Sequence, residues 1–240
     1  MIDRLCRVAF ALSATVLGVA ACTIPPAPTV SAAPDPAQAY NAAVARAAVL
    51  DPRNALDHKL IRTDRKAPTV TVVTWTTTAT ADKFYPIGRS AVGVDVWVTV
   101  SPQLRELCAR FADDPDALRL RLQQLLGLPP HHEDRTFVVM DVRPDALIRP
   151  CPDPDPSTPT CTWDFPARVS NKHKAWFAEQ AVSRYRAPPD GYPWTRLGYT
   201  YDWSPDGALS SVSEFVVPKG TAVTVTGKTS TAAYCHPPQS

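Results

Sequence analysis

The sequence predicts an α+β fold in which residues 68–240 form one domain with a mostly antiparallel sheet and about three helices. Segments of strand character and of helix character follow one another in groups, whereas a parallel α/β sheet requires strict alternation. The C-terminal part has turn signals at 204–207 (SPDG) and 218–220 (PKG), which are typical of a meander of antiparallel strands. The 26 prolines against 9 glycines add many extended joints and argue against an all-helical bundle.

Six segments have the composition expected of strands. Residues 69–78 are rich in Thr, Val and Trp. Residues 92–100 alternate, with five valines on one face and Asp95, Trp97 and Thr99 on the other. The other predicted strands are 137–142, 197–203, 210–217 and 221–227, and the proline-rich residues 144–166 are predicted to be a loop.

Helix signals occur before the domain and inside it. The alanine-rich segment 37–50 is predicted to be a helix that stops before a proline. Within the domain, Ser101 is expected to cap a first helix, and Asp114 a second helix that ends at Gly127. Residues 171–186 form the third predicted helix. Its expected apolar side consists of Ala175, Ala178, Val182 and Tyr185.

The charge balance excludes two classes of protein. The 240 residues contain 25 Lys plus Arg and 23 Asp plus Glu, so the formal net charge is +2. This near balance argues against a polybasic nucleic-acid binder, and no nucleic-acid partner is expected. It also excludes an acidic disordered tail, and no internal repeat is visible.

The N-terminus has the features of an export signal. Arg4 and Arg7 precede an uncharged run, residues 8–21, that ends in small residues before Cys22. Fourteen helical residues cover about 21 Å, which is short of the roughly 30 Å hydrocarbon core of a bilayer. The run is therefore interpreted as the h-region of a signal and not as a spanning helix.

The end of this signal, Val19-Ala20-Ala21-Cys22, resembles the lipobox of bacterial lipoproteins. The resemblance implies cleavage before Cys22 and acylation of its thiol and new amino group, with palmitate among the chains. Several acyl chains would hold the protein stably to a membrane. Thr23 differs from the aspartate that resembles an inner-membrane retention signal, so the outer membrane is expected in a Gram-negative host and the outer face of the plasma membrane otherwise. The alternative is a plain secretory signal with a chance cysteine.

Three parts follow from these signals. Residues 1–21 are the predicted lipoprotein signal peptide, and residues 22–67 contain the lipidated cysteine, a proline-rich tether and the alanine-rich helix. The globular domain occupies residues 68–240. Beyond the lipobox, this domain resembles no characterised family.

The remaining cysteines suggest disulfides. Apart from Cys6 in the signal and Cys22, the chain has four, an even number in an exported protein. Of the three possible pairings we favour Cys151–Cys161 with Cys108–Cys235, because the stiff, polar segment between Cys151 and Cys161 needs a covalent bridge. The alternative for Cys108 is a buried free thiol on an apolar helix face.

No catalytic signature is complete, so no catalytic residue, metal ligand or cofactor is assigned. His132-Glu133 is followed by threonine where a zincin needs its second histidine, and a metal site around it would need distant ligands such as His173 or His236. The segment 220–229 has the wrong glycine spacing for a phosphate-binding loop. The segment 88–93 is one residue too long for a nucleophile elbow.

Aromatic side chains are concentrated in residues 184–203 together with three arginines. If 197–203 is a strand, alternate aromatics share one face, where they would suit a sugar ring, a peptide or a protein interface. The alternative is that these rings are the core of the sheet. The candidate binding residues are Tyr199, Tyr201, Trp203, Trp194 and Arg196.

These observations predict a non-enzymatic, lipid-anchored protein of the cell envelope that binds an envelope protein or a cell-wall glycan. One alternative is an envelope hydrolase that acts on peptidoglycan or another glycan. Another is a structural subunit of an envelope assembly. A concave site that joins two carboxylates would favour the hydrolase.

Overall fold

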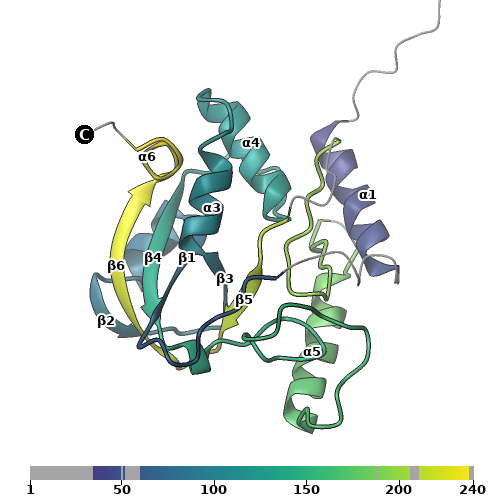
Figure 1. Cartoon of the computed structure of the whole chain (residues 1–240). Helices are drawn as coiled ribbons and strands as arrows, with labels where there is room; N and C mark the ends of the chain where they lie inside the picture. The colour runs from purple at the N-terminus through teal and green to yellow at the C-terminus, as the bar shows by residue number, and fades with distance from the viewer. Residues whose placement is uncertain (1–34, 50, 52–59, 188, 206–210, 238–240) are drawn as a thin grey trace, which may run out of the picture. The chain divides into compact units, whose positions relative to one another are not determined.

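A six-stranded antiparallel sheet forms the centre of the fold (Figure 1). The computed structural model describes residues 35–49, 51, 60–187, 189–205 and 211–237. The order across the sheet is β2-β6-β4-β1-β3-β5, and every neighbouring pair is antiparallel. The strands are β1 (Val70–Thr77), β2 (Gly88–Ala91), β3 (Val96–Val100), β4 (Arg135–Val142), β5 (Glu214–Val217) and β6 (Ala222–Ser230).

Six α-helices accompany the sheet within the described residues, which is more than the sequence predicted. The helices are α1 (Pro36–Ala48), α2 (Thr78–Phe84), α3 (Ser101–Cys108), α4 (Pro115–Leu125), α5 (Asn171–Arg184) and α6 (Thr231–Cys235), and residues Pro144–Ala146 form a 3-10 turn. The additional helices inside the domain, α2 and α6, are short and directly continue strands. The predicted α+β class with a mostly antiparallel sheet is confirmed.

The N-terminal predictions lie outside the described part of the chain. This applies to the signal peptide 1–21, to Cys22 and to most of the tether. Residues Pro34–Ser240 form one compact unit, which contains everything that the structure describes. Among the described residues, no helix is long and apolar enough to cross a bilayer.

The two faces of the sheet bury different sets of side chains. Alternate residues of β3, Val96 and Val98, enter one core together with Phe215 of β5. The opposite face packs on α3, α4 and α6 through a second core that contains Leu104, Leu122 and other apolar side chains. Because side chains alternate along a strand, Trp97 and Thr99 project to the second side. The predicted alternation is therefore confirmed for residues 96–100.

Of the two predicted helix caps in the domain, the cap of α4 is confirmed and the cap of α3 is wrong. Asp114 caps α4 as predicted, and its carboxylate accepts from the Ala117 amide at 2.8 Å. The predicted serine cap of α3 is wrong, because Val100 occupies the cap position and Ser101 is the first helical residue. Ser101 instead meets Tyr234, whose hydroxyl donates to the Ser101 carbonyl at 2.8 Å.

The α5 helix buries a different side from the predicted one. It ends at Arg184, and Val182 on the expected apolar side is 79% exposed. The packing side contains His173, Trp176 and Phe177. The His173 ring contacts the other two rings, and Phe177 contacts Trp194. The packing side of α5 is therefore aromatic.

Residues 197–203 do not form the predicted strand. The segment runs beside the edge of the sheet and pairs only through isolated bridges, Tyr199↔Ser213 and Trp194↔Thr200, within the described residues. It is held by side chains instead, since Asp202 forms a bidentate ion pair with Arg121 of α4. Tyr199, Tyr201 and Trp203 therefore do not share the face of a regular strand.

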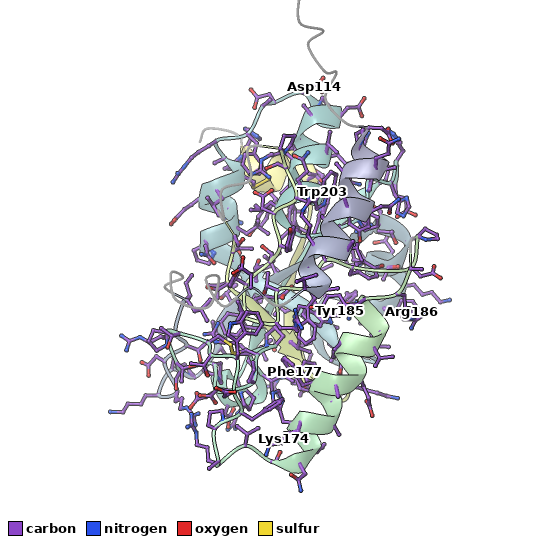
Figure 2. The ribbon with its side chains drawn as sticks, turned by 90° about the vertical axis from the view of Figure 1, so that its right-hand side faces the viewer. Asp114, Lys174, Phe177, Tyr185, Arg186 and Trp203 are labelled. Atoms are coloured by element: carbon purple, nitrogen blue, oxygen red, sulfur yellow. A yellow bond between two sulfur atoms is a disulfide. The ribbon has the colours of Figure 1, made fainter. Side chains whose placement is uncertain are left out.

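The α1 helix packs on this segment through the Trp203 ring. Tyr40 meets that ring edge-on at 5.6 Å, and the Tyr40 hydroxyl donates to the Gly191 carbonyl at 2.9 Å. Arg196 donates to the carbonyl of Ala47 at 3.0 Å and closes the end of the helix. In Figure 2, α1 and α5 lie on the same side of the molecule, and Tyr185 lies near the point where they meet.

Both predicted disulfides are confirmed. Cys108 and Cys235 join α3 to α6 with their Cα atoms 5.1 Å apart, and the Cα atoms of Cys151 and Cys161 are 6.3 Å apart. The loop that the second disulfide closes folds around the fully buried Arg149. The Arg149 guanidinium donates to three carbonyl oxygens, those of Ile61, Pro156 and Thr158.

Candidate functional site

A glutamate on a buried strand defines the candidate site. In the segment SVSEFVV, Glu214 shares one side of the chain with Val212 and Val216, both of which are fully buried. Its register partner on β3 is Thr99, so these two side chains and Trp97 project from the same face of the sheet. A carboxylate at such a position leaves water and needs a polar partner.

Two adjoining cavities meet at this glutamate, and we call them together the Glu214 cleft. The larger cavity has a volume of about 290 Å³, and the smaller, which we call the recess, has about 90 Å³. Trp97, Leu126, Leu128 and Glu214 line both. The recess is further lined by Gly127, Arg184, Tyr192, Pro193, Trp194 and Tyr201.

The larger cavity opens where two strands separate. The register between β1 and β3 covers two pairs, Val72↔Val100 and Val73↔Thr99. Beyond these pairs, residues 74–76 of β1 and 96–98 of β3 line the cavity. The divergence of two neighbouring strands therefore leaves space beside Thr99 and Glu214.

The loop after α4 forms one wall of the recess. Gly127 has a φ of 64°, and a Cβ atom there would lie 3.3 Å from the Tyr201 carbonyl and 3.4 Å from the Pro193 carbonyl. Glycine thus lets the loop approach both segments closely. The Trp203 indole holds this loop, because its N–H donates to the carbonyls of Gln123 and Leu128.

Polar atoms without partners concentrate in the Glu214 cleft. Among the described residues, twelve buried side-chain N and O atoms have no hydrogen-bond partner, and five of them belong to cleft residues. They are Trp97 Nε1, Thr99 Oγ1, Arg184 Nε, Trp194 Nε1 and Glu214 Oε2. Buried polar atoms are nearly always satisfied in native proteins. Their accumulation on residues that line one cleft makes this cleft the candidate site.

Burial controls the charge of the cleft. The Glu214 residue retains partial accessibility, but its Oε2 atom is sealed from solvent. This burial raises the pKa of Glu214 to about 8, against the opposing positive charge of Arg184. Burial also lowers the pKa of Arg184, which still leaves the guanidinium charged at neutral pH. At pH 7 the recess therefore contains a protonated acid and one cation.

Aromatic rings position the polar groups. The Arg184 guanidinium lies over the Trp97 ring at 4.7 Å and over the Tyr192 ring at 5.3 Å. Trp97 meets Trp194 edge-on at 5.9 Å and stacks on Trp176 at 6.5 Å. These contacts restrict the side-chain rotamers, so the donors of the cleft are held in place before any ligand arrives.

The structure places the five candidate binding residues in three different places: the recess, a second cavity, and the packing beneath α1. Trp194 lines the recess, and Tyr201 lines both the recess and a separate cavity of about 510 Å³. Tyr199 and Arg196 line only that second cavity, and Trp203 is buried beneath α1. The structure therefore brings Trp194 and Tyr201 to the Glu214 cleft and leaves the other three outside it.

Two other cavities, both larger than the Glu214 cleft, offer less chemistry. The cavity of about 590 Å³ beside β6 contains three cations, each of which has an acidic partner: Lys228 with Asp82, Arg135 with Glu133, and Arg119 with Asp116. The cavity of about 510 Å³ is bordered by Asp51 and Ser211, which are next in the chain to residues that the structure does not describe. We assign no site to either.

The histidines that the sequence analysis considered as metal ligands lie in separate places and make other contacts. His132 Nδ1 lies 2.9 Å from an Arg119 nitrogen, and His236 forms an ion-pair contact with Asp113. The His173 ring is buried, with Nε2 2.8 Å from the Cys151 carbonyl. Across the described ranges, no group of three or more His, Cys, Asp or Glu side chains could hold a metal ion.

Sequence reasoning missed the centre of the site. Glu214 was placed in a predicted strand without being singled out, although it is the one charged residue in a run of Ser, Val and Phe. A charge that shares a face with Val212 and Val216 is a signal that can be read from the sequence alone. The contribution of Arg184 could not be read in the same way, because it comes from the end of a distant helix.

Comparison with known proteins identifies no relative: no family model, no curated protein and no solved structure matches the chain.

Proposed function

We propose that the protein is a lipid-anchored binding module of the cell envelope, and that the Glu214 cleft is its ligand site. The expected ligand is a small polar envelope component with apolar surfaces, such as a unit of a cell-wall glycan or its peptide. The observation that carries the proposal is the group of five buried polar atoms without partners around one cleft.

The composition of the cleft supports ligand binding. Small-molecule sites combine mostly apolar and aromatic walls with a few fixed polar groups. Trp97, Tyr192 and Trp194 supply aromatic surfaces, and the partnerless N–H, O–H and carboxyl groups supply hydrogen bonds. The two cavities, of about 290 and 90 Å³, suit a ligand of the size of one sugar or one amino-acid residue.

The arrangement favours binding over hydrolysis by paired carboxylates. Asp95 also lines the larger cavity, but it accepts hydrogen bonds from the Trp176 indole and the Lys219 amide. These two hydrogen bonds occupy the Asp95 carboxylate, and we therefore propose that it does not serve as the second carboxyl of a hydrolase.

The anchor is proposed from the sequence, and the disulfides support export. Disulfides persist in oxidising compartments outside the cytosol. The test compares wild type with Cys22→Ser by membrane fractionation and by mass spectrometry of the mature N-terminus. We expect the variant to lose its acyl mass and its membrane association. An intact N-terminus in the native protein, or an unchanged distribution of the variant, would contradict the anchor.

Ligand binding is tested on the domain with soluble peptidoglycan fragments, with intrinsic fluorescence as the signal because Trp97 and Trp194 line the cleft. Saturable binding is expected for wild type and for the control Trp163→Ala, whose ring lies outside the cleft. Trp97→Ala should abolish it. Thr99→Val, which removes one partnerless hydroxyl without changing shape, should weaken it and guards against misfolding of the larger change. Equal binding by all variants would refute the site.

A further inference from the structure

We infer that the ligand of the Glu214 cleft carries a carboxylate, which the recess holds against Arg184. This inference rests on the proposed function and specifies the chemical class that the site takes. It follows from the kind of atoms that lack partners and from the charge of the recess.

The partnerless atoms of the recess are mainly donors. Trp97 Nε1, Trp194 Nε1 and Arg184 Nε each carry an N–H group and accept nothing. These atoms lie beneath the surface of the recess, so a ligand reaches them as the lining side chains shift, and it must then present several acceptor lone pairs. A carboxylate presents about four lone-pair sites on two oxygens, whereas a sugar hydroxyl presents two and also brings a donor.

The charge of the recess matches one negative charge. Arg184 supplies one cation, and it forms no ion pair among the described residues, since its terminal nitrogen donates to the Gln180 amide oxygen at 3.2 Å. The raised pKa of Glu214 keeps that carboxyl protonated near neutral pH, so it does not repel an anion and can donate its own proton. A singly charged carboxylate therefore balances the site.

Other titratable groups face the same region. Tyr192 and Tyr40 act electrostatically on Arg184, and Arg186 opposes its charge from the same end of α5. Tyr201 borders the recess, and Asp95 lines the larger cavity. Asp95 is engaged by the Trp176 indole and the Lys219 amide. Arg184 and Glu214 therefore determine how the recess responds to pH.

The two cavities take different parts of the ligand: the recess takes the carboxylate, and the larger cavity takes the rest, which we call the body. The recess, at about 90 Å³, is the smaller of the two cavities, and the carboxylate is assigned to it because Arg184 lines it. The body of the ligand then occupies the adjoining space of about 290 Å³ beside Thr99. Tyr192, which is 36% exposed, stands at the solvent side of the recess.

The experiment compares matched probes that differ only in the carboxylate. One pair is N-acetylmuramate and its carboxamide, and the other is N-acetylalanine and its amide. Calorimetric titration at pH 6.5 should show that wild type binds at least one carboxylate at least about tenfold more tightly than its neutral partner, as a charged hydrogen bond predicts. The pair that shows the preference identifies a sugar acid or a peptide terminus as the source.

Charge variants then locate the carboxylate. Arg184→Gln should abolish the preference, while Arg186→Gln, an exposed arginine two residues further on, should retain it (Figure 2). The preference should fall in wild type as the pH rises above about 8, because Glu214 ionises and repels the anion. Glu214→Gln should retain the preference at high pH.

The outcomes separate this inference from the proposed function. Equal affinity within both pairs, with binding still lost in Trp97→Ala, overturns the carboxylate and leaves the binding site standing. A preference for inorganic phosphate over every carboxylate also overturns it. If no probe binds and the peptidoglycan fragments do not bind either, both proposals fail.

Discussion

Replacing Glu214 with glutamine should change how the stability of the domain depends on pH. The folded protein raises the pKa of this carboxyl from 4.5 to about 8. A group whose pKa is higher in the folded state stabilises the fold fully below the unfolded value, and that stability is lost as the pH rises towards the folded value. Glutamine does not titrate, so the variant lacks this loss.

The magnitude follows from the shift. Each pH unit between the two pKa values removes about 1.4 kcal/mol from the free energy of unfolding of the wild type. Between pH 5 and pH 7 the wild type should therefore lose about 2–3 kcal/mol relative to Glu214→Gln. This is a large part of the 5–15 kcal/mol typical of a domain. The other titrating groups are common to both proteins and cancel in the difference.

Urea unfolding at pH 5, 6 and 7, with both disulfides intact, measures this difference. A difference in the free energy of unfolding that is the same at every pH would reflect how the amide packs. The prediction concerns how this difference changes with pH. Glu106, exposed on α3, is the control carboxylate, and Glu106→Gln should follow the wild type at each pH. Parallel curves for wild type and Glu214→Gln would show that the cleft does not desolvate the carboxyl, and the reasoning would be refuted.

Three further changes test the packing by urea unfolding. Gly198→Ala should lower the free energy of unfolding by about 2–4 kcal/mol, because the residue has a φ of 77° and its Cβ would lie 2.7 Å from the buried Arg149 side chain. The control Gly220→Ala, also at positive φ but in open space, should lower it by only about 1–2 kcal/mol. Equal losses would exclude the clash. Double replacement of Cys108 and Cys235 by alanine should lose up to about 5 kcal/mol, because a sequence separation of 127 residues makes a large loop, and an unchanged unfolding midpoint would contradict the bridge. Tyr40→Phe should lose about 1 kcal/mol with the hydrogen bond to Gly191, and a gain would show that this bond does not hold α1.

Some elements were readable because their determinants are local. The α4 helix begins after Asp114 and ends near Gly127, as capping and glycine signals predicted. The alternation of residues 96–100 reports the two faces of a strand that has a core on both sides. The cysteine pairing was predictable because the segment between Cys151 and Cys161 has little alternative to a short covalent loop.

Other predictions failed where distant packing decides. Residues 197–203 alternate like a strand, but Arg121 of α4 and the edge of the sheet hold them in an irregular path. On the predicted apolar side of α5, Tyr185 does contact Trp194. The three aliphatic residues of that side are exposed, and the helix packs another aromatic ring, that of Phe177, against Trp194 instead. In both cases the local pattern was real, and the partner that the segment meets determined the outcome.

For this protein, the sequence alone determined the α+β class, the two disulfides and the position of a single glutamate in an apolar strand. Only the tertiary structure decided what that glutamate does. Its pKa depends on the desolvation imposed by the loop after α4, on Trp97 from β3 and on the charge of Arg184 at the end of α5. These groups are far apart in the chain, so their combined effect on one carboxyl exists only once the chain is folded.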